Sequence, residues 1–507
     1  MKSRAILMNP PTAAPSSEIL LNLAYLSSTL KQAGHEVLVL DATAPYNQLS
    51  EEEIKHRILE FKPDFIGVTL TINFIPQTYD YLKRLSDLKI PIIAGGPHAN
   101  CLPEEVMQHG VDIVIMGEGE KTILEIMEHF AGEKNLKDIN GICFKEKNGE
   151  ICYTKKRMLI QNLDEIAFPD YDSFPIKYYS GSSNPNSNPI FWGIFSSRGC
   201  PFNCTFCSSH NVFGRTFRFR SPENVFNEIQ YLAEKFGAEA FAFQDDEAFI
   251  NKKRIIEFCK LVEKSKFPLR FSARLRIDSL DAEMLAIMKS SGFKRLAFGI
   301  ESFNDETLKN INKKYNVAKI HEGFKILKEV NFSPINFNNI IGFPWETPEH
   351  FKMNLKEISK IDKSIMYYSG SIVPIPYPGT ALYNQYHEQY GFTNWWLDSS
   401  KNSPLPPVNA FFTIFLSTKI PLYQKDIFWN HSTEMRKAIE HFSWAISKKE
   451  LRQFYSNSMF YLIYILCKTS HFLWKKNPKL EKVIFTPLSN LFRKWGIDRK
   501  AKFIYQG

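Results

Sequence analysis

The chain has 507 residues, enough for two or three domains, and 44% of them are hydrophobic, as in an ordinary globular protein. Eight cysteines in so long a chain do not form a disulfide framework, and their clustering indicates a reducing compartment. The N-terminal apolar run is too short for a signal peptide, and no stretch reaches the length of a membrane span. We therefore expect a cytoplasmic protein.

The positive charge is concentrated at one end. The net charge is +9, from 63 Lys and Arg against 54 Asp and Glu. Residues 448–507 hold 13 basic and 3 acidic residues, a local balance of +10, so the remainder is close to neutral at −1. Such a tail could face an anionic membrane, a nucleic acid or a phosphorylated substrate, or it could be a solvated basic helical face.

Residues 1–140 alternate short apolar runs with amphipathic segments. The runs are continuously apolar, which is typical of strands buried on both faces of a parallel sheet, so we predict a doubly wound, Rossmann-like α/β domain. The expected strands are Ala5–Met8, Val37–Leu40, Phe65–Leu70, Ile90–Gly96 and Ile113–Met116, and the expected helices are Ile19–Gly34, Glu51–Phe61, Ile75–Leu88, Pro103–Gly110 and Glu120–Gly132.

Ligands bind such sheets outside the carboxyl ends of the strands. Glycines at those ends let a bulky ligand approach the backbone. A lone histidine there is more often structural or solvent-facing than a ligand, which applies to His98. The candidate ligand-binding residues at these ends are Pro10, Thr69, Leu70, Gly95, Gly96, His98, Gly117 and Glu118.

The run Gly95-Gly-Pro-His98, with Gly117-Glu-Gly-Glu120 after it, resembles the cobalamin-binding domain that precedes the barrel in one large class of radical S-adenosylmethionine (SAM) enzymes. The resemblance implies that the eight candidates above contact cobalamin. The loop after the first strand has no Asp-x-His-x-x-Gly, so it offers no histidine as a lower axial cobalt ligand. That suits this class, and it leaves open a domain that keeps the fold without the cofactor.

Residues 141–190 read as a hairpin and a linker. Ile142–Lys145 and Ile151–Thr154 flank an Asn-Gly turn, which favours a β-hairpin. Residues 181–189 are rich in Ser, Asn and Pro and indicate a flexible linker or a loop on the substrate side.

Residues 191–395 repeat a strand–helix unit six times, which predicts an open parallel (β/α)6 barrel with its functional residues at the carboxyl strand ends. The expected strands are Phe191–Ser197, Ala240–Phe243, Phe271–Arg274, Arg295–Ile300, Ile335–Ile341 and Tyr368–Pro374. The expected helices are Pro222–Phe236, Lys252–Lys264, Ala282–Ser291, Val317–Val330 and Pro348–Ile361.

Three cysteines, Cys200, Cys204 and Cys207, follow the first of these strands in the spacing Cys-x3-Cys-x2-Cys. Three thiolates in one loop can hold a four-iron cluster and leave one iron open to a small molecule. The alternative is a zinc site closed by His210, although no second Cys-x2-Cys accompanies it.

Polar residues follow several of the predicted barrel strands. Asp245 and Asp246 could accept hydrogen bonds from an ammonium group, or they could cap the next helix. Arg274 could pair with a carboxylate, and Arg276 is the alternative residue for this role. Glu301 requires a ligand or a basic partner if it is buried.

The cysteine motif, with Phe206 before its last cysteine, resembles the signature of the radical SAM enzymes, as do the runs that contain Asp245, Glu301 and Gly342. The resemblance implies a [4Fe-4S] cluster whose open iron binds SAM, and one-electron cleavage of SAM to a 5′-deoxyadenosyl radical. The implied SAM-binding residues are Phe206, Asp245, Asp246, Arg274, Glu301, Gly342 and Pro344.

Residues 396–507 are aromatic, basic and mainly helical in pattern. We expect helices over Thr433–Ala445 and Lys448–Cys467 after a linker over Asp398–Pro407. Met459–Cys467 is apolar on all sides, which predicts a buried helix by default, with an interfacial segment or a cap over the substrate as alternatives. No motif in this region identifies a substrate.

Together these resemblances imply a cobalamin-dependent radical SAM enzyme that methylates an unactivated carbon. Cyclisation, rearrangement or carbon–carbon coupling with the same cofactors is the alternative reaction, and a non-catalytic cobalamin- or metal-sensing module is the alternative class. We expect a small-molecule substrate (a lipid, glycan or natural-product intermediate) and an external one-electron donor such as flavodoxin or ferredoxin. We also expect peripheral membrane contact through the basic tail, and no nucleic acid.

Overall fold

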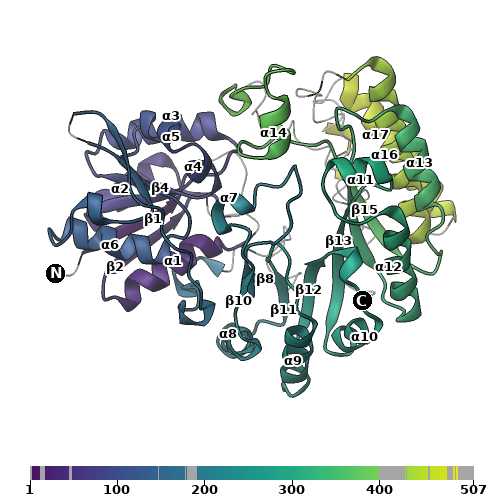
Figure 1. The fold of residues 1–507 in the computed structure, drawn as a ribbon, viewed down its shortest axis with the longest axis horizontal. Helices are drawn as coiled ribbons and strands as arrows, with labels where there is room; N and C mark the ends of the chain where they lie inside the picture. Colours follow the sequence, from purple (N-terminus) through teal and green to yellow (C-terminus); the bar gives the residue numbers. More distant parts are fainter. Residues whose placement is uncertain are drawn as a thin grey trace.

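The computed structural model describes residues 3–11, 18–44, 48–146, 148–176, 179, 191–398, 429, 431–454, 457–476, 483–485, 487, 488 and 491. Two large sheets form the body of the molecule, one in the N-terminal third and one in the middle of the chain (Figure 1). A pair of C-terminal helices packs against the outer side of the second sheet.

The first sheet has the strand order β2-β1-β3-β4-β5-β6-β7. Strands β1 to β5 are parallel, and β6 and β7 are antiparallel to their neighbours. The order reverses between β1 and β3, which places the ligand-binding crevice of such a sheet at that point. The strands are β1 (Arg4–Asn9), β2 (Glu36–Asp41), β3 (Phe65–Thr69), β4 (Ile92–Gly95), β5 (Ile113–Ile115), β6 (Ile142–Lys145) and β7 (Ile151–Tyr153).

Helices cover both faces of this sheet, as the continuous apolar strands predicted. Ala5 and Leu7 of β1 pack into the core beneath α1 and α6, whereas Ile6 and Met8 pack into the core beneath α2, α3 and α5. Successive side chains of a strand point to opposite faces, so each strand feeds both cores. The helices are α1 (Leu21–Gln32), α2 (Glu51–Phe61), α3 (Ile75–Ser86), α4 (Pro97–Cys101), α5 (Pro103–Gln108) and α6 (Glu120–Phe130).

The predicted hairpin forms and becomes part of the first sheet. Its strand β6 pairs antiparallel with β5, so the sheet continues beyond residue 140. Cys143 lies buried within β6 as a free thiol, as expected of a strand residue. The predicted linker over residues 181–189 lies outside the described residues.

The second sheet has the order β15-β14-β13-β12-β11-β8 with every pair parallel, so β8 and β15 are both edges and the barrel is open. The predicted α/β architecture with a six-stranded partial barrel is confirmed. The strands are β8 (Phe191–Ile194), β11 (Ala240–Phe243), β12 (Arg270–Leu275), β13 (Phe293–Glu301), β14 (Ile335–Ile340) and β15 (Tyr367–Ile372).

The helices of the barrel begin at capping residues that the sequence places there. Ser221, Asn251, Asp281 and Asn316 each accept a hydrogen bond from the backbone of the helix that follows. The helices are α8 (Pro222–Phe236), α9 (Lys252–Glu263), α10 (Ala282–Ser290), α12 (Val317–Glu329) and α13 (Pro348–Ile358), with shorter α7 (His210–Phe213), α11 (Asp305–Asn310) and α14 (Ala381–Tyr386). A two-stranded ribbon of β9 (Ser197–Arg198) and β10 (Arg218–Phe219) leads into and out of the cysteine loop.

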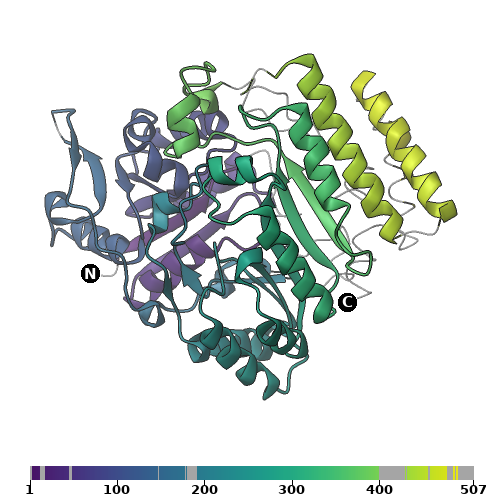
Figure 2. The same cartoon turned by 45° about the vertical axis from the view of Figure 1, so that its right-hand side comes forward.

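The C-terminal helices differ from the prediction at their boundary. One helix, α16, runs without a break over Thr433–Phe454, and α17 follows over Asn457–Lys476. Helix α16 packs on α13 and β15, and α17 packs on α16 as the outermost helix on that side (Figure 2). Within the described part of the chain, no helix is both long enough and apolar enough to cross a membrane.

Candidate functional site

A cavity of about 800 Å³ opens at the carboxyl ends of β1, β3, β4 and β5, next to the first strand of the barrel. Its size falls in the range of small-molecule and cofactor sites. The predicted residues in its wall are Thr69, Gly95, Gly96, Gly117 and Glu118. The structure therefore brings five of the eight predicted cobalamin-binding residues to one cavity.

The two glycines at the end of β4 keep this cavity open in different ways. A Cβ added to Gly95 would meet no atom within 4 Å, so the missing side chain leaves free space in the cavity. A Cβ added to Gly96 would lie 2.8 Å from the carbonyl oxygen of Leu70, and Gly96 has a φ of +96°. Gly96 is therefore required by the backbone, whereas Gly95 gives a ligand access to it.

Three predicted cobalamin-binding residues, Pro10, Leu70 and His98, are buried and do not line the cavity. Nε2 of His98 lies 2.9 Å from the hydroxyl of Tyr79 and 3.2 Å from Oε1 of Glu105. His98 therefore has the structural role that was the alternative in the sequence. Because its side chain bonds within the N-terminal domain, it does not reach the cavity.

One wall of the cavity comes from the second domain. The sequence pattern of the first domain could not predict it. Gly193, Phe195 and Gln244, from the ends of β8 and β11, line it together with Arg198 and Phe213. The cavity thus lies between the two sheets. Sequence reasoning missed these residues because their contribution depends on how the domains dock.

Two residues of the first domain that line the cavity were not predicted, Asn9 at the end of β1 and Asn22 in α1. The side-chain amide of Asn22 donates to Oγ1 of Thr69 at 2.8 Å. Asn9 follows a buried strand directly, so the strand-end signal used for Pro10 could have identified it.

Glu118 has a second role as the centre of a buried ion cluster between the domains. Nη1 of Arg198 donates to it at 3.0 Å, and Nη1 of Arg218 donates to both of its oxygens at 2.9 Å. The backbone N–H of Ile160 donates to its Oε2 at 2.7 Å, and Arg198 also pairs with Glu120 at 2.5 Å. Both arginines lie in the ribbon beside the cysteine loop, so the cluster joins the cavity wall to that loop.

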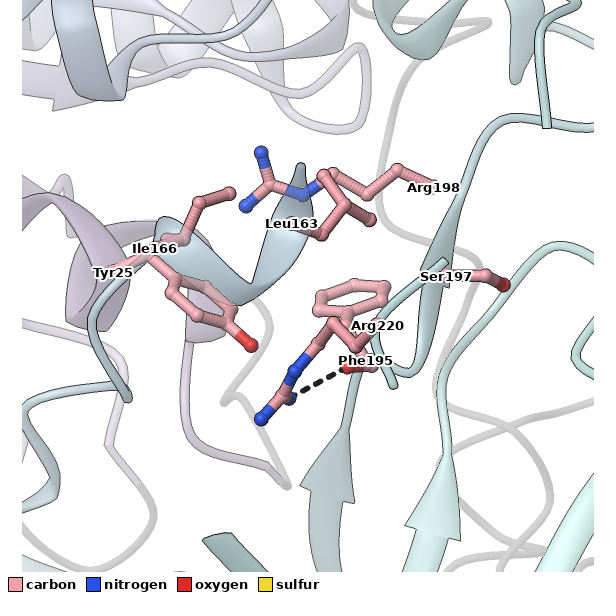
Figure 3. Close-up of a pocket in the computed structure, with 7 residues that line it drawn as sticks. All are labelled: Tyr25, Leu163, Ile166, Phe195, Ser197, Arg198 and Arg220. Atoms are coloured by element: carbon pink, nitrogen blue, oxygen red, sulfur yellow. Dashed lines mark hydrogen bonds between the residues drawn. The ribbon is translucent and has the colours of Figure 1, made fainter. Parts of the chain in front are cut away.

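A much smaller cavity, of about 10 Å³, lies behind this cluster between α1 and the ribbon. Figure 3 shows Tyr25 and Arg198 on opposite sides of it, and the dashed line marks the hydrogen bond from Arg220 to the carbonyl oxygen of Phe195, at 2.9 Å. Its volume is about that of one water molecule. Tyr25, Phe195 and Arg198 also line the larger cavity.

The cysteine loop leaves β9 through a turn that needs glycine. Gly199 has a φ of +83°, and a Cβ there would lie 2.4 Å from the carbonyl oxygen of Thr216. Burial raises the pKa of Cys200 to about 11. Burial also raises the pKa of Cys204, although the positive charges of Lys313 and Arg276 nearby lower it in part. A bound iron would have to displace these protons, since thiolate is the ligand.

The donor set of the loop fits an iron–sulfur cluster. On a four-iron cluster each thiolate binds a different iron, so the three sulfur atoms need not converge on one point. Zinc requires such convergence. Among the described residues, no group of three His, Cys, Asp or Glu side chains is arranged to hold a single metal ion.

Asp245 and Asp246 have different environments. Asp245 is fully buried, and its carboxylate accepts hydrogen bonds from the N–H and hydroxyl of Ser196, both at 3.0 Å, and from the hydroxyl of Ser197. These hydrogen bonds hold the segment that leads into the cysteine loop, and the role of Asp245 in SAM binding stays a prediction. Asp246 is exposed, and Ser209 donates to it at 2.8 Å, which keeps it beside the loop.

The two arginines after β12 also separate. Arg276 is buried, donates to the carbonyl oxygen of Lys313 at 2.6 Å, and stacks on Phe202 of the cysteine loop, 3.7 Å from the ring centroid. Arg274 is exposed. Alternating burial along β12 places Arg274 on the barrel's inner side, where it stays the candidate for binding a carboxylate.

Glu301 has the basic partner that its burial required. Nζ of Lys313 donates to its Oε1 at 2.9 Å, and both side chains are about nine-tenths buried. Glu301 has a φ of +64°, at a point where the register between β13 and β14 shifts. Such a backbone strain is typical of functional sites. The prediction that Glu301 binds SAM stays a prediction.

Gly342, Phe343 and Pro344 form the turn after β14. The N–H groups of Gly342 and Phe343 donate to Oε2 of Glu346, at 2.7 and 3.1 Å, and a Cβ on Gly342 would approach Ile439 of α16 to 3.1 Å. Gly342 thus gives space to the C-terminal helix. Phe206 and Phe343 have ring centroids 6.5 Å apart, so this turn contacts the cysteine loop. Pro344 is half-buried.

Comparison with known proteins identifies the family. Residues 14–127 match the B12 binding domain, and residues 194–358 match the radical SAM superfamily. The chain is 30% identical over 465 residues to an uncharacterized methyltransferase of Pyrococcus horikoshii, covering 86% of this chain and 97% of the relative. The chain belongs to the B12-binding radical SAM enzymes and resembles their class B methyltransferases.

Two further similarities bear on the reaction and the fold of this radical SAM enzyme. It is 27% identical over 370 residues to an anaerobic magnesium-protoporphyrin IX monomethyl ester cyclase of Rubrivivax gelatinosus, covering 70% of this chain and 65% of the relative. The fold matches the cobalamin-dependent SAM radical enzyme OxsB, solved with aqua-cobalamin and SAM, with a TM-score of 0.67 at 17% identity over 97% and 75% of the two chains. The two domains imply a [4Fe-4S] cluster, SAM and cobalamin as cofactors.

Replacement of Glu118 by Gln should destabilise the radical SAM enzyme. The substitution removes the one carboxylate that faces two buried guanidinium groups, and breaking such a pair costs about 3–5 kcal/mol. We expect the unfolding temperature to fall by about 5 °C or more in a thermal melt. The exposed Glu60→Gln should leave it unchanged, since its pair with His56 is a surface contact. Equal melts for both variants would contradict the role of the cluster.

Glu346 should make stability depend on pH. Burial raises its pKa from 4.5 to about 7, against the N–H groups of Gly342 and Phe343. The folded state therefore binds the proton more tightly than the unfolded state, and this stabilisation is lost as the pH rises from 4.5 to about 7. Glu346→Gln should match the wild type at about pH 4 and be more stable by about 3 kcal/mol at about pH 8, measured by chemical unfolding. A constant difference across this range would refute the assignment.

Proposed function

We propose that this cobalamin-dependent radical SAM enzyme transfers a methyl group to an unactivated carbon of a small molecule. The observation that carries the proposal is the cavity of about 800 Å³ between the B12-binding sheet and the barrel, whose wall includes Arg198, two residues before Cys200. When bound, the cluster and SAM supply a 5′-deoxyadenosyl radical, and cobalamin supplies the methyl group. The similarity to methyltransferases over nearly the whole relative supports this reaction.

The chain's own residues orient these groups rather than perform the chemistry. Gly95 and Gly117 leave the backbone open to a large ligand, while Gln244 reaches the same cavity from the barrel. Cys200, Cys204 and Cys207 would hold the cluster. Asp246 and Arg274 remain exposed next to it, and their opposite charges suit the ammonium and carboxylate of SAM. Fixing two cofactors on either side of one substrate is itself a large part of catalysis.

An acidic one-electron donor would have a route to the cysteine loop from outside. Pro201 and Asn203 are exposed, and the side chain of Asn312 donates to the carbonyl oxygen of Asn203 at 2.7 Å. Asn312 lines an open recess of about 600 Å³ whose charged residues are Lys309, Lys314 and Lys319 against Asp278 and Asp305. The excess of positive charge would favour an acidic donor such as flavodoxin or ferredoxin.

Ring formation with the same cofactors is the second candidate, because the family also contains a cyclase at 27% identity. Product mass separates the two. In a substrate screen under anaerobic conditions with SAM and a reductant, methyl transfer adds one methyl group to the substrate, and deuterated SAM methyl groups would appear in the product. Cyclisation removes hydrogen and transfers no deuterium, which would overturn the methyltransferase proposal.

Cys204→Ala should abolish cleavage of SAM to 5′-deoxyadenosine and leave cobalamin binding intact. Loss of one thiolate prevents the cluster from forming, whereas the cobalamin cavity is lined by other residues. Chromatography for 5′-deoxyadenosine and visible spectroscopy for cobalamin measure the two functions. Cys259→Ala, at a buried cysteine outside the loop, is the control and should retain cleavage. Loss of both functions in Cys204→Ala would contradict the separation of the two sites.

Gly95→Leu should weaken cobalamin binding by tenfold or more without unfolding the protein. The added side chain extends into the cavity, where a Cβ meets nothing within 4 Å. Gly95→Ala should have a smaller effect, because one methyl group fills little of the space. Titration of the two apoproteins with hydroxocobalamin gives the affinities, and thermal melts test folding. Unchanged affinity in Gly95→Leu would place cobalamin elsewhere.

A further inference from the structure

Two side-chain amides lie in the wall of the cavity between the sheets, one from each domain. Asn9 is the last residue of β1, and Gln244 follows β11 of the barrel. An asparagine or glutamine can present either its N–H groups or its carbonyl oxygen to a ligand, so the orientation of the amide decides which ligand groups it binds. In both residues a carboxylate of the protein fixes this orientation.

The amide of Asn9 is fixed by two residues at and after the end of β2. Its Nδ2 donates to Oδ1 of Asp41 at 3.1 Å and to Oγ1 of Thr43 at 2.6 Å. A carboxylate only accepts, so the nitrogen of Asn9 and not its oxygen must face Asp41. The carboxylate is itself buried and held, because the hydroxyl of Tyr179 donates to its other oxygen at 2.5 Å. Both N–H bonds of the Asn9 amide are therefore used within the protein.

The amide of Gln244 is fixed across the domain boundary. Its Nε2 donates at 2.8 Å to Oε2 of Glu18, in the segment before α1. Since this partner is also a carboxylate, the nitrogen of Gln244 must face it. Gly193 gives the side chain room to reach this position, because a Cβ on Gly193 would lie only 3.3 Å from Cγ of Gln244.

The two amides therefore leave carbonyl oxygens for the cavity. Within the part of the chain that the structure describes, no donor bonds to Oδ1 of Asn9 or to Oε1 of Gln244. Arg198 is the one lysine or arginine among the described residues of the wall, and it pairs with Glu118 and Glu120. A ligand that fills the cavity must supply donors of its own to satisfy these two oxygens.

We propose that Asn9 and Gln244 select a corrinoid whose side chains are carboxamides over one whose side chains are carboxylates. The corrin ring of cobalamin carries carboxamides around its rim, and their N–H groups are the donors that carbonyl oxygens require. A carboxylate in their place would bring acceptors against acceptors and would meet no unpaired lysine or arginine among the described residues of the wall. The inference rests on the part of the proposed function that places cobalamin in this cavity, and it does not depend on methyl transfer.

Equilibrium dialysis of the full-length protein, purified without cobalamin, against two corrinoids tests the proposal. Cobinamide keeps the carboxamides, and cobyrinic acid has carboxylates in their place. We expect the wild type to bind cobinamide about a hundredfold more tightly, since two hydrogen bonds of about tenfold each separate the two ligands. The measurement needs no SAM, cluster or turnover, so it is independent of activity.

Gln244→Met should reduce this selectivity about tenfold. Methionine has nearly the length of glutamine but no amide oxygen, so cobinamide loses a hydrogen bond while cobyrinic acid loses an unfavourable contact. A purely structural effect would weaken both ligands alike and leave the ratio of their affinities unchanged. Gln230→Met is the matched control, because Gln230 of α8 donates to Glu234 at 3.0 Å and does not line the cavity. Its ratio should equal that of the wild type.

Gln244→Lys tests the same position by a gain of affinity. The ammonium group replaces an acceptor with a charged donor, so the affinity for cobyrinic acid should rise about tenfold. A destabilised variant does not gain affinity, and thermal melts of each variant check the fold.

Two results would overturn the inference alone: equal affinity of the wild type for the two corrinoids, or a ratio that Gln244→Met leaves unchanged. Failure of the folded wild type to bind either corrinoid is a different result, which would overturn the assignment of cobalamin to this cavity together with the inference.

Discussion

The buried contact between Glu118 and two arginines holds the two halves of this enzyme in register. Glu118 lies in the loop after β5 of the B12-binding sheet, while Arg198 and Arg218 belong to the ribbon from which the cysteine loop emerges. Two guanidinium groups and a carboxylate so deeply buried tolerate little displacement, because an unpaired charge there is costly. This contact connects the wall of the cavity between the domains to the ribbon that carries the cysteine loop.

Several charged residues near the candidate site hold its backbone and its loops in place. Asp245 ties down Ser196 and Ser197 ahead of the cysteine loop, and Arg276 clamps Phe202 within it. Glu346 fixes the turn at Gly342 in a similar way. Asp246 and Arg274 are exposed beside the cysteine loop, so their charges are open to a ligand to a greater extent than those of the buried Asp245 and Arg276. Rigid support of this kind is what a radical reaction between two cofactors requires.

Much of the fold was accessible from sequence, for specific reasons. Continuous apolar strands predicted the doubly wound sheet, and β1 does feed cores on both of its faces. Six strand–helix units predicted the open barrel. The bounds of the C-terminal helices were harder to predict. The local pattern suggested that one helix ends before Lys448, whereas α16 continues through Phe454. Packing of α16 against β15 and α13 stabilises turns that local propensity alone does not extend.

By itself, the sequence determined which residues can do chemistry. Three cysteines in eight residues, and glycines at the ends of β4 and β5, need no tertiary context to be recognised, because metal ligation and close backbone approach depend on residue type and local spacing. Only the tertiary structure decided which polar residues are available. The side chains of His98 and Asp245 bond to Tyr79 and Ser196, which lie 19 and 49 residues away in sequence, and Arg198 and Gln244 line the cavity from another domain. Burial and docking are properties of the assembled chain, so no local pattern could assign them.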